Sequence, residues 1–280
     1  MIMDTSSPIP IYDSTRRIHP ALEELHEVFR FRHLILQLVR RDVLTRYKRS
    51  FLGIAWTMLN PLGMMLVWTI AFSQVFYRGG GVDFAAYMLN GLLAWLFFSQ
   101  TTTAAMVNFV WGGGLLHRIY MPRTSFALAA SGTGLINLVL SLVPLVGVML
   151  VTGVPLHWSA LLTPFVMLVL VIFSLGVGLL LAAFAVYFPD IIEMYQIFLQ
   201  AWMFLTPIMY PEEILPGAYR FWVTQLNPMY HLVRLYRIPL YYGRLPAVGE
   251  WLPSALLALA VFVIGWLVFT SKSDEYAYRL

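Results

Sequence analysis

The sequence predicts an all-α membrane protein: six transmembrane helices, an N-terminal amphipathic interfacial helix before them, and short re-entrant or interfacial helices between spans five and six. Three observations predict this fold. Of the 280 residues, 60% are hydrophobic and 11% are charged, whereas about 25% of the residues in an average soluble domain are charged. The mean hydropathy is +0.74. Long uncharged runs follow one another from residue 51 to residue 271, which favours one membrane domain.

Residues 1–20 form a polar N-terminal tail without a basic start, an apolar core and a cleavage site, so no removable signal peptide is predicted. Residues 21–50 predict one cytoplasmic helix with an apolar stripe opposite its charged residues. We expect this helix to lie in the headgroup layer with its arginines toward anionic lipid. The alternative is a solvated helix packed on another protein. The stripe consists of Leu22, Leu25, Phe29, Leu36, Val39 and Val43.

The membrane domain, residues 51–271, contains six runs without Asp, Glu, Lys, Arg or His. A bilayer core about 30 Å thick is crossed by about 20 apolar helical residues, and five of the runs reach that length while the fifth in order is shorter. Each run predicts one span. The six predicted spans are Leu52–Phe76, Phe84–Val110, Phe126–Thr152, Ser159–Val186, Met194–Tyr210 and Trp251–Thr270.

The distribution of Lys and Arg predicts the orientation, because cytoplasmic flanks of spans are enriched in them. Thirteen of the 18 Lys and Arg residues lie before the first span, between spans two and three, or after the last span. Six spans place all these segments on one side. We therefore expect both termini, including the tail 272–280, to face the cytoplasm.

Two regions between spans predict irregular structure. Gly112–Gly114 and Pro122 bracket about two helical turns, which predicts a short basic helix that fits a groove on a partner; the alternative is an ordinary positively charged loop. The outer region 207–250 contains several prolines and predicts short amphipathic helices at, or dipping into, the outer leaflet. There Arg234 and Arg237 fall off an apolar stripe formed by Met229, Leu232, Val233, Tyr236 and Leu240.

Recognisable catalytic chemistry is missing from the sequence. It has no cysteine, no nucleotide-binding phosphate loop, no zinc-protease motif and no nucleophile elbow. We therefore expect no catalytic residue, no metal site and no cofactor in this chain. The basic residues flank spans without a nucleic-acid-binding motif, so no nucleic-acid partner is predicted. No span carries an ionisable residue at its centre, and the nearest candidates for binding a coupling ion are Asp190 and Glu193.

Polar and aromatic residues do occur within the runs. Amide side chains there are expected mainly to form hydrogen bonds between helices, and the alternative is that some line a wetted path. They are Asn60, Gln74, Asn90, Gln100, Asn108, Asn137, Gln196 and Gln200. Aromatic rings are expected in interfacial belts or in the core, and the alternative is a stacking lane for sugars. The candidate substrate path consists of Trp68, Phe72, Trp95, Phe98 and Trp202.

Residues 40–56 resemble a family signature, R-D-x-x-x-R-Y-x-x-S-x-L-G-x-x-W, which begins here at Arg41. Pro207–Pro211 is similar to a P-I-x-Y-P element of the same family, and Asn227-Pro228 to its N-P turn. The family is that of the permease subunits of type-2 ABC exporters that move lipid-linked polysaccharides such as O-antigen, capsule and teichoic acid. The resemblance covers about residues 30 to 275.

The resemblance implies roles for particular residues. An outer gate or re-entrant element would contain Pro207, Tyr210, Pro211, Asn227 and Pro228. Two positions depart from the pattern: Pro189 precedes Asp190 where relatives often carry Arg, and Met121 stands where an aromatic residue is common. The ATPase-coupling surface would contain Arg40, Arg41, Asp42, Arg46, Tyr47, Arg49, Arg118, Ile119, Tyr120, Met121, Pro122 and Arg123.

The resemblance also implies partners and a location. Two copies of this chain would pair with two cytoplasmic ABC ATPase subunits, which would bind Mg-ATP, and would move a lipid-linked polysaccharide across the bacterial inner membrane. The chain itself would not be an enzyme. The alternatives are an ABC exporter of a drug or small lipid, an intramembrane glycosyl- or acyltransferase, and a channel or scaffold. The transferase would use a carboxylate or histidine cluster near the membrane, and no such cluster is seen in the sequence.

Overall fold

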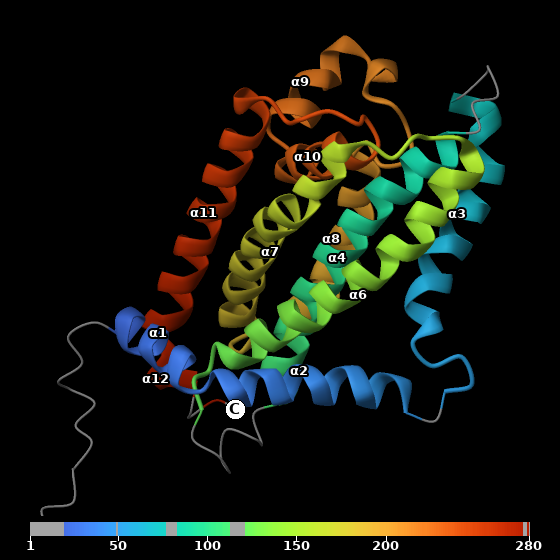
Figure 1. Ribbon diagram of the computed structural model, residues 1–280. Coiled ribbons are helices and arrows are strands. Elements are labelled where there is room, and N and C mark those ends of the chain that lie inside the picture. The colour runs from blue at the N-terminus through green and yellow to red at the C-terminus, as the bar shows by residue number, and fades with distance from the viewer. Residues whose placement is uncertain (1–19, 49, 77–82, 113–120, 277–278, 280) are drawn as a thin grey trace, which may run out of the picture.

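The computed structural model describes residues 20–48, 50–76, 83–112, 121–276 and 279, and the elements in these ranges are all helical. Long helices lie alongside one another, α1 and α2 lie across their lower ends, and α9 and α10 lie at their upper ends (Figure 1). The elements are α1 (Pro20–Arg30), α2 (Arg32–Tyr47), α3 (Ala55–Phe76), α4 (Phe84–Trp111), α6 (Ser125–Thr152), η2 (Trp158–Leu162), α7 (Thr163–Ala185), α8 (Ile191–Leu205), η3 (Glu212–Ile214), α9 (Gly217–Gln225), α10 (Pro228–Leu240), α11 (Val248–Ser271) and α12 (Ser273–Tyr276).

Four helices among the described residues are long and apolar enough to cross a membrane: α3, α6, η2 with α7, and α11. The chain is therefore a multi-pass membrane protein. Helix α4 has 28 residues and would extend about 42 Å; its Asn, Gln and Thr residues make it less apolar. Helix α8 has 15 residues, about 22 Å of helix.

The predicted fifth span, Met194–Tyr210, extends too far toward its C-terminal end. Helix α8 ends at Leu205, and Thr206 has the extended backbone angles φ −101° and ψ 129°. Thr206 precedes Pro207, and the proline ring disfavours helical angles in the residue before it. The chain therefore leaves the helix at this point.

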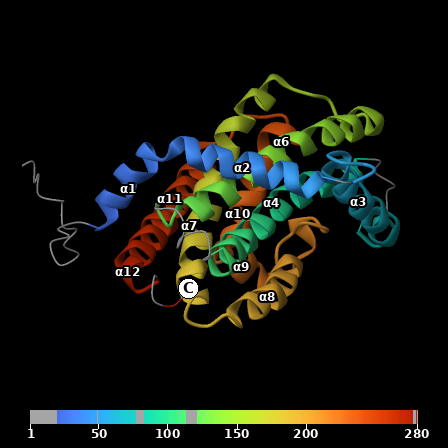
Figure 2. The same cartoon turned by 90° about the horizontal axis from the view of Figure 1, so that it is seen from below.

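The single helix predicted for residues 21–50 is wrong, because the chain forms two helices that meet at Phe31. Leu22, Phe29 and Leu36 of the predicted stripe are exposed, whereas Val39 is buried. Leu38 and Val39 pack in a core cluster with residues of α4, α6 and α7. Seen from below, α2 crosses α6 (Figure 2), which it contacts. The break lets α1 turn toward α11, which it contacts.

Helix α4 lies at the centre of the molecule and contacts α3, α6, α7, α8 and α10. Helices α7 and α11 form the closest pair, because glycines let their backbones touch. A Cβ atom on Gly265 would lie 2.1 Å from the carbonyl oxygen of Gly176, and one on Gly176 would lie 2.5 Å from Cα of Phe262. In contrast, α3 is packed on few sides, because only 11% of its residues from Ala55 to Phe72 are buried. The helices α4, α6, α7 and α11 therefore form a core, with α3 and α8 at its margin.

Candidate functional site

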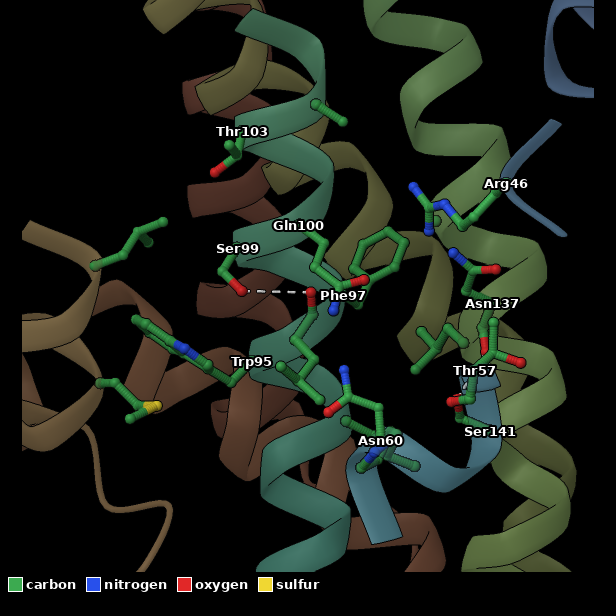
Figure 3. Close-up of a pocket in the computed structure, with 18 of the residues that line it drawn as sticks. Arg46, Thr57, Asn60, Trp95, Phe97, Ser99, Gln100, Thr103, Asn137 and Ser141 are labelled. Carbon is green, nitrogen blue, oxygen red and sulfur yellow. Dashed lines mark hydrogen bonds between the residues drawn. The ribbon is translucent and has the colours of Figure 1, made fainter. Parts of the chain in front are cut away.

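A cavity of about 990 Å³ lies between α3, α4, α6 and α8, and Arg46 of α2 reaches its edge. Its volume is at the upper end of the range of about 300–1,000 Å³ that is typical of small-molecule sites. The cavity arises because α3 and α8 sit apart on the two sides of α4. Figure 3 shows side chains from these helices converging on it.

Polar uncharged side chains line much of this cavity. They include hydroxyl groups of Thr57, Ser99, Thr103 and Ser141, several of which are labelled in Figure 3. Six of the eight intramembrane amides line the cavity, which supports the alternative that some of them face a wetted path. Asn90 is completely buried elsewhere, and its amide atoms have no hydrogen-bond partner in the described structure. The cavity amides are Asn60, Gln100, Asn108, Asn137, Gln196 and Gln200.

Arg46 is the sole charged side chain among the described residues that line the cavity. It also lines a smaller cavity of about 370 Å³ beside α2, together with Asp42 and Thr45. In Figure 3 its guanidinium group points toward Gln100 and Asn137. The lining thus offers hydrogen bonds, ring faces and one guanidinium group, but no carboxylate, imidazole or amine that could serve as a general base.

The other predicted coupling residues in the described ranges lie on α2 and directly before α6. Arg40 is exposed, and Arg41 pairs with the neighbouring carboxylate of Asp42 at 2.9 Å. Met121 and Pro122 are buried at the start of α6, next to the half-buried Arg123. The side chain of Tyr47 and the whole of residues Arg49 and Arg118–Tyr120 lie outside the described residues.

Glu24 of α1 is a functional candidate that the sequence analysis did not identify. Its carboxylate accepts hydrogen bonds of 3.0 Å from the backbone N–H and from the hydroxyl of Thr124. Burial raises the pKa of this carboxyl group, and the bonds from Thr124 oppose that shift. At the other side of α1, the Ala21 carbonyl accepts a 3.2 Å bond from Trp266 Nε1. Helix α1 therefore joins the start of α6, directly after residues 121–123, to the end of α11.

The aromatic residues predicted for the substrate path fall into two places. Trp95, Phe98 and Trp202 form one cluster, with ring centroids 5.3 to 5.9 Å apart. Trp95 lines the cavity, whereas Phe98 is fully buried and belongs to the core. Trp68 and Phe72 instead pack at the outer end of α3 against a separate apolar cluster.

Asn227 connects the end of α8 to the start of α10. Its side-chain oxygen caps α10 by accepting from Met229 N at 3.0 Å, and it also accepts from Trp202 Nε1 at 2.8 Å. Its side-chain nitrogen donates to the Leu205 carbonyl at 3.2 Å and to Thr206 Oγ1 at 3.0 Å. Pro228 follows at the first position of the helix, where its missing N–H leaves no helical bond unmade.

The other outer-gate residues surround this junction. The Pro207 carbonyl accepts a hydrogen bond from Arg237 at 2.7 Å. The Tyr210 hydroxyl donates to the Phe204 carbonyl at 2.9 Å, so it folds the segment back over the end of α8. Pro211 precedes the single turn η3.

Helix α10 is enclosed by protein over most of its surface. Its predicted stripe is buried, as expected, but Arg237 is also buried, with 4% of its surface exposed. The expectation that Arg237 lies off the buried face is therefore wrong. Its guanidinium group lies over the ring of Tyr87 and donates hydrogen bonds to neighbouring oxygens, so the buried charge has a polar environment. Arg234, one turn earlier, is partly exposed and pairs with Glu212 and Glu250.

Comparison with known proteins identifies the family of this chain. Residues 33–241 match the family described as ABC-2 type transporter. The chain is 33% identical to the O-antigen export system permease protein RfbA of Myxococcus xanthus, over 90% of this chain and 97% of that protein. It is 22% identical to a protein of the same name from Klebsiella pneumoniae, over 73% of this chain and 78% of that protein. It is 25% identical to the polysialic acid transport protein KpsM of Escherichia coli, over 85% of this chain and 92% of that protein. The chain therefore belongs to the ABC-2 type transporter family.

Proposed function

We propose that this chain is the transmembrane permease subunit of an ATP-driven exporter that moves a lipid-linked polysaccharide out of the cytoplasm. The names of its relatives, an O-antigen export permease and a polysialic acid transport protein, support this substrate class. The observation that carries the proposal is the large cavity with a polar and aromatic lining inside an otherwise apolar helical domain. A path for a drug or small lipid would not call for so many amide and hydroxyl groups.

The lining suits a polymer of sugars attached to a phosphate-containing lipid. Amide and hydroxyl side chains can bond sugar hydroxyl groups, and the exposed indole ring of Trp56 offers an apolar face to the C–H side of a sugar ring. The guanidinium group of Arg46 is a planar fork of donors that matches phosphate oxygens. Arg46 thus has a second role open to it, beside the coupling role that the family signature implies: it holds the charged end of the substrate at the cytoplasmic edge of the cavity.

The proposed assembly has two permeases and two ATPase subunits in the bacterial inner membrane. Helices α4 and α8 join the four apolar helices to make six spans, and both termini lie in the cytoplasm, as the Lys and Arg distribution favours. A second permease copy would cover apolar residues of α3 and α8 beside the cavity, such as Ile70 and Ile197, each 70% exposed. The ATPase subunits would bind Mg-ATP and push on α1, α2 and residues 118–123.

The test is export in a bacterial strain from which the gene for this chain has been deleted. We expect deletion to remove the polysaccharide from the cell surface and to leave the lipid-linked polymer inside, and the restored gene to reverse both effects. Arg46→Ala should reduce surface polymer while the protein still inserts in the membrane; Arg220→Ala, an exposed arginine outside the cavity, is the matched control. Unchanged surface polysaccharide in the deletion strain would contradict the proposal.

A further inference from the structure

An apolar cluster, which we call the outer plug, adjoins the outer end of the cavity. It consists of Phe84, Met88 and Met209, with Trp68, Phe72, Met203 and Tyr210 packed against them. Met203 also lines the cavity, so the plug begins where the cavity ends. Phe84, Met88 and Met209 are each at most 4% exposed, and a polymer that leaves the cavity in this direction must displace them.

One part of the plug comes from an irregular segment of the chain. Residues 206–211 run between α8 and η3 without regular structure, and this segment contributes Met209 and Tyr210. Buried backbone carbonyl groups of such a segment must find partners elsewhere. The position of Met209 therefore depends on whatever groups bind the carbonyls beside it.

Arg237 provides those groups. Its Nη1 donates to the Pro207 carbonyl at 2.7 Å and its Nη2 donates to the Ile208 carbonyl at 2.9 Å. Nη1 also donates to the Tyr87 hydroxyl at 2.8 Å, and the guanidinium carbon lies 3.7 Å from the centre of the Tyr87 ring. The Tyr87 hydroxyl in turn donates to the Tyr210 carbonyl at 3.3 Å. Arg237 thus binds the segment just before Met209, and Tyr87 of α4 binds it just after Met209.

We propose that Arg237 and Tyr87 form a clasp that holds the outer plug closed, and that both are positioning residues of the exit. This inference rests on the proposed function, because it takes the cavity as the substrate path. The described partners of the guanidinium group are a hydroxyl, two carbonyls and a ring face, and none is an acid. The clasp therefore acts through the geometry of its bonds, and it opens when the 206–211 segment moves away from α4.

The geometry of the clasp is specific to arginine. A planar fork can reach two carbonyls and one hydroxyl together, whereas the ammonium group of lysine is a single point on a flexible stem. The fork also fits against Gly91 of α4, where an added Cβ atom would lie 2.2 Å from Nη2. Gly91→Ala should therefore displace the guanidinium group without removing it, and Tyr87→Phe should remove one hydroxyl while it retains the ring.

The experiment measures access to the plug with a single thiol. The chain has no cysteine, so Met209→Cys introduces one reactive site, and its labelling by a membrane-impermeant maleimide is followed in proteoliposomes. We expect slow labelling with the clasp intact, and labelling faster by about fivefold or more after Arg237→Lys, Tyr87→Phe or Gly91→Ala, since each change removes or displaces at least one buried hydrogen bond of about 1 kcal/mol.

Two controls separate opening of the plug from unfolding. Ala258→Cys places the thiol at a buried position of α11 with 1% exposure, and it should stay protected in every clasp variant. Arg234→Lys changes the neighbouring, partly exposed arginine and should leave Met209→Cys labelling slow. Unchanged labelling of Met209→Cys in all clasp variants would overturn the proposal. If Arg237→Lys exposes Ala258→Cys as well, that variant is unfolded and Tyr87→Phe decides. Labelling does not depend on transport, so this result stands apart from the export test.

Discussion

Replacement of Asn227 tests how strongly the outer junction holds α8 and α10 together. Asn227→Ala removes four hydrogen bonds, to Trp202, Leu205, Thr206 and Met229. Hydrogen bonds of this kind contribute about 0.6–1.5 kcal/mol each in folded membrane and soluble proteins, so the four together account for about 2–6 kcal/mol. Asn227→Asp keeps the acceptor oxygen and replaces the donor by a second acceptor that faces the Leu205 carbonyl. We expect the stability of Asn227→Asp to lie between that of the wild type and that of Asn227→Ala.

The assay is thermal unfolding of the detergent-solubilised protein, followed by size-exclusion chromatography after heating. A loss of about 2–6 kcal/mol should lower the midpoint by about 4 °C or more in a chain of this size. Gln225→Ala is the matched control, since Gln225 is exposed two residues earlier. A midpoint for Asn227→Ala equal to that of Gln225→Ala would refute the reasoning, because four buried bonds cannot be lost without effect if they form in the membrane domain.

Two further predictions concern the lower face and the core. Because burial raises the pKa of Glu24, the folded state binds the proton of this group more tightly than the unfolded chain does. The stabilisation is therefore greatest below the ordinary pKa and is lost as the pH rises through the raised value. Glu24→Gln, which keeps an acceptor for Thr124, should flatten the pH dependence of the unfolding midpoint between pH 4.5 and neutrality, and an unchanged slope would count against this prediction. Gly265→Ala should destabilise the packing of α7 on α11 by about 1–3 kcal/mol through overpacking. The control is Gly147→Ala, whose added Cβ atom meets no atom within 4 Å, and it should be neutral or stabilising by up to about 1 kcal/mol. Equal unfolding midpoints for the two variants would contradict the close packing of α7 and α11.

The sequence predicts the membrane helices well because their signal is local. Uncharged runs of spanning length mark α3, α6, α7 and α11, and Asn227-Pro228 marks the start of α10. The break at Thr206 is missed, because the predicted fifth span runs past Pro207. The break at Phe31 has no such mark, since residues 22–48 contain neither glycine nor proline. There the packing of α1 on α11 determines where the helix ends, and helical periodicity carries no information about such a contact.

The site is harder to predict because it is assembled from distant segments. Arg237 is a typical exposed residue by periodicity, and its partners are Tyr87, 150 positions away, and two backbone carbonyls. Carbonyl groups occur at every residue and leave no pattern in a sequence. Likewise, whether Gln100 or Asn137 faces a neighbouring helix or a cavity depends on how far α3 and α8 lie from α4. Glu24 resembles its neighbours Glu23 and Glu27 until its contact with Thr124 is seen.

The most direct test of the central claim is photocrosslinking from inside the cavity. A photoreactive amino acid is introduced at one of two positions in cells that make the polysaccharide. One position is Gln196, which lines the cavity, and the other is Leu259 of α11, which is 52% exposed. The account predicts an adduct with the lipid-linked polymer from position 196, in amounts that rise when ATP hydrolysis is blocked, and none from position 259. Equal adducts from both positions, or none from position 196 while export proceeds, would contradict it.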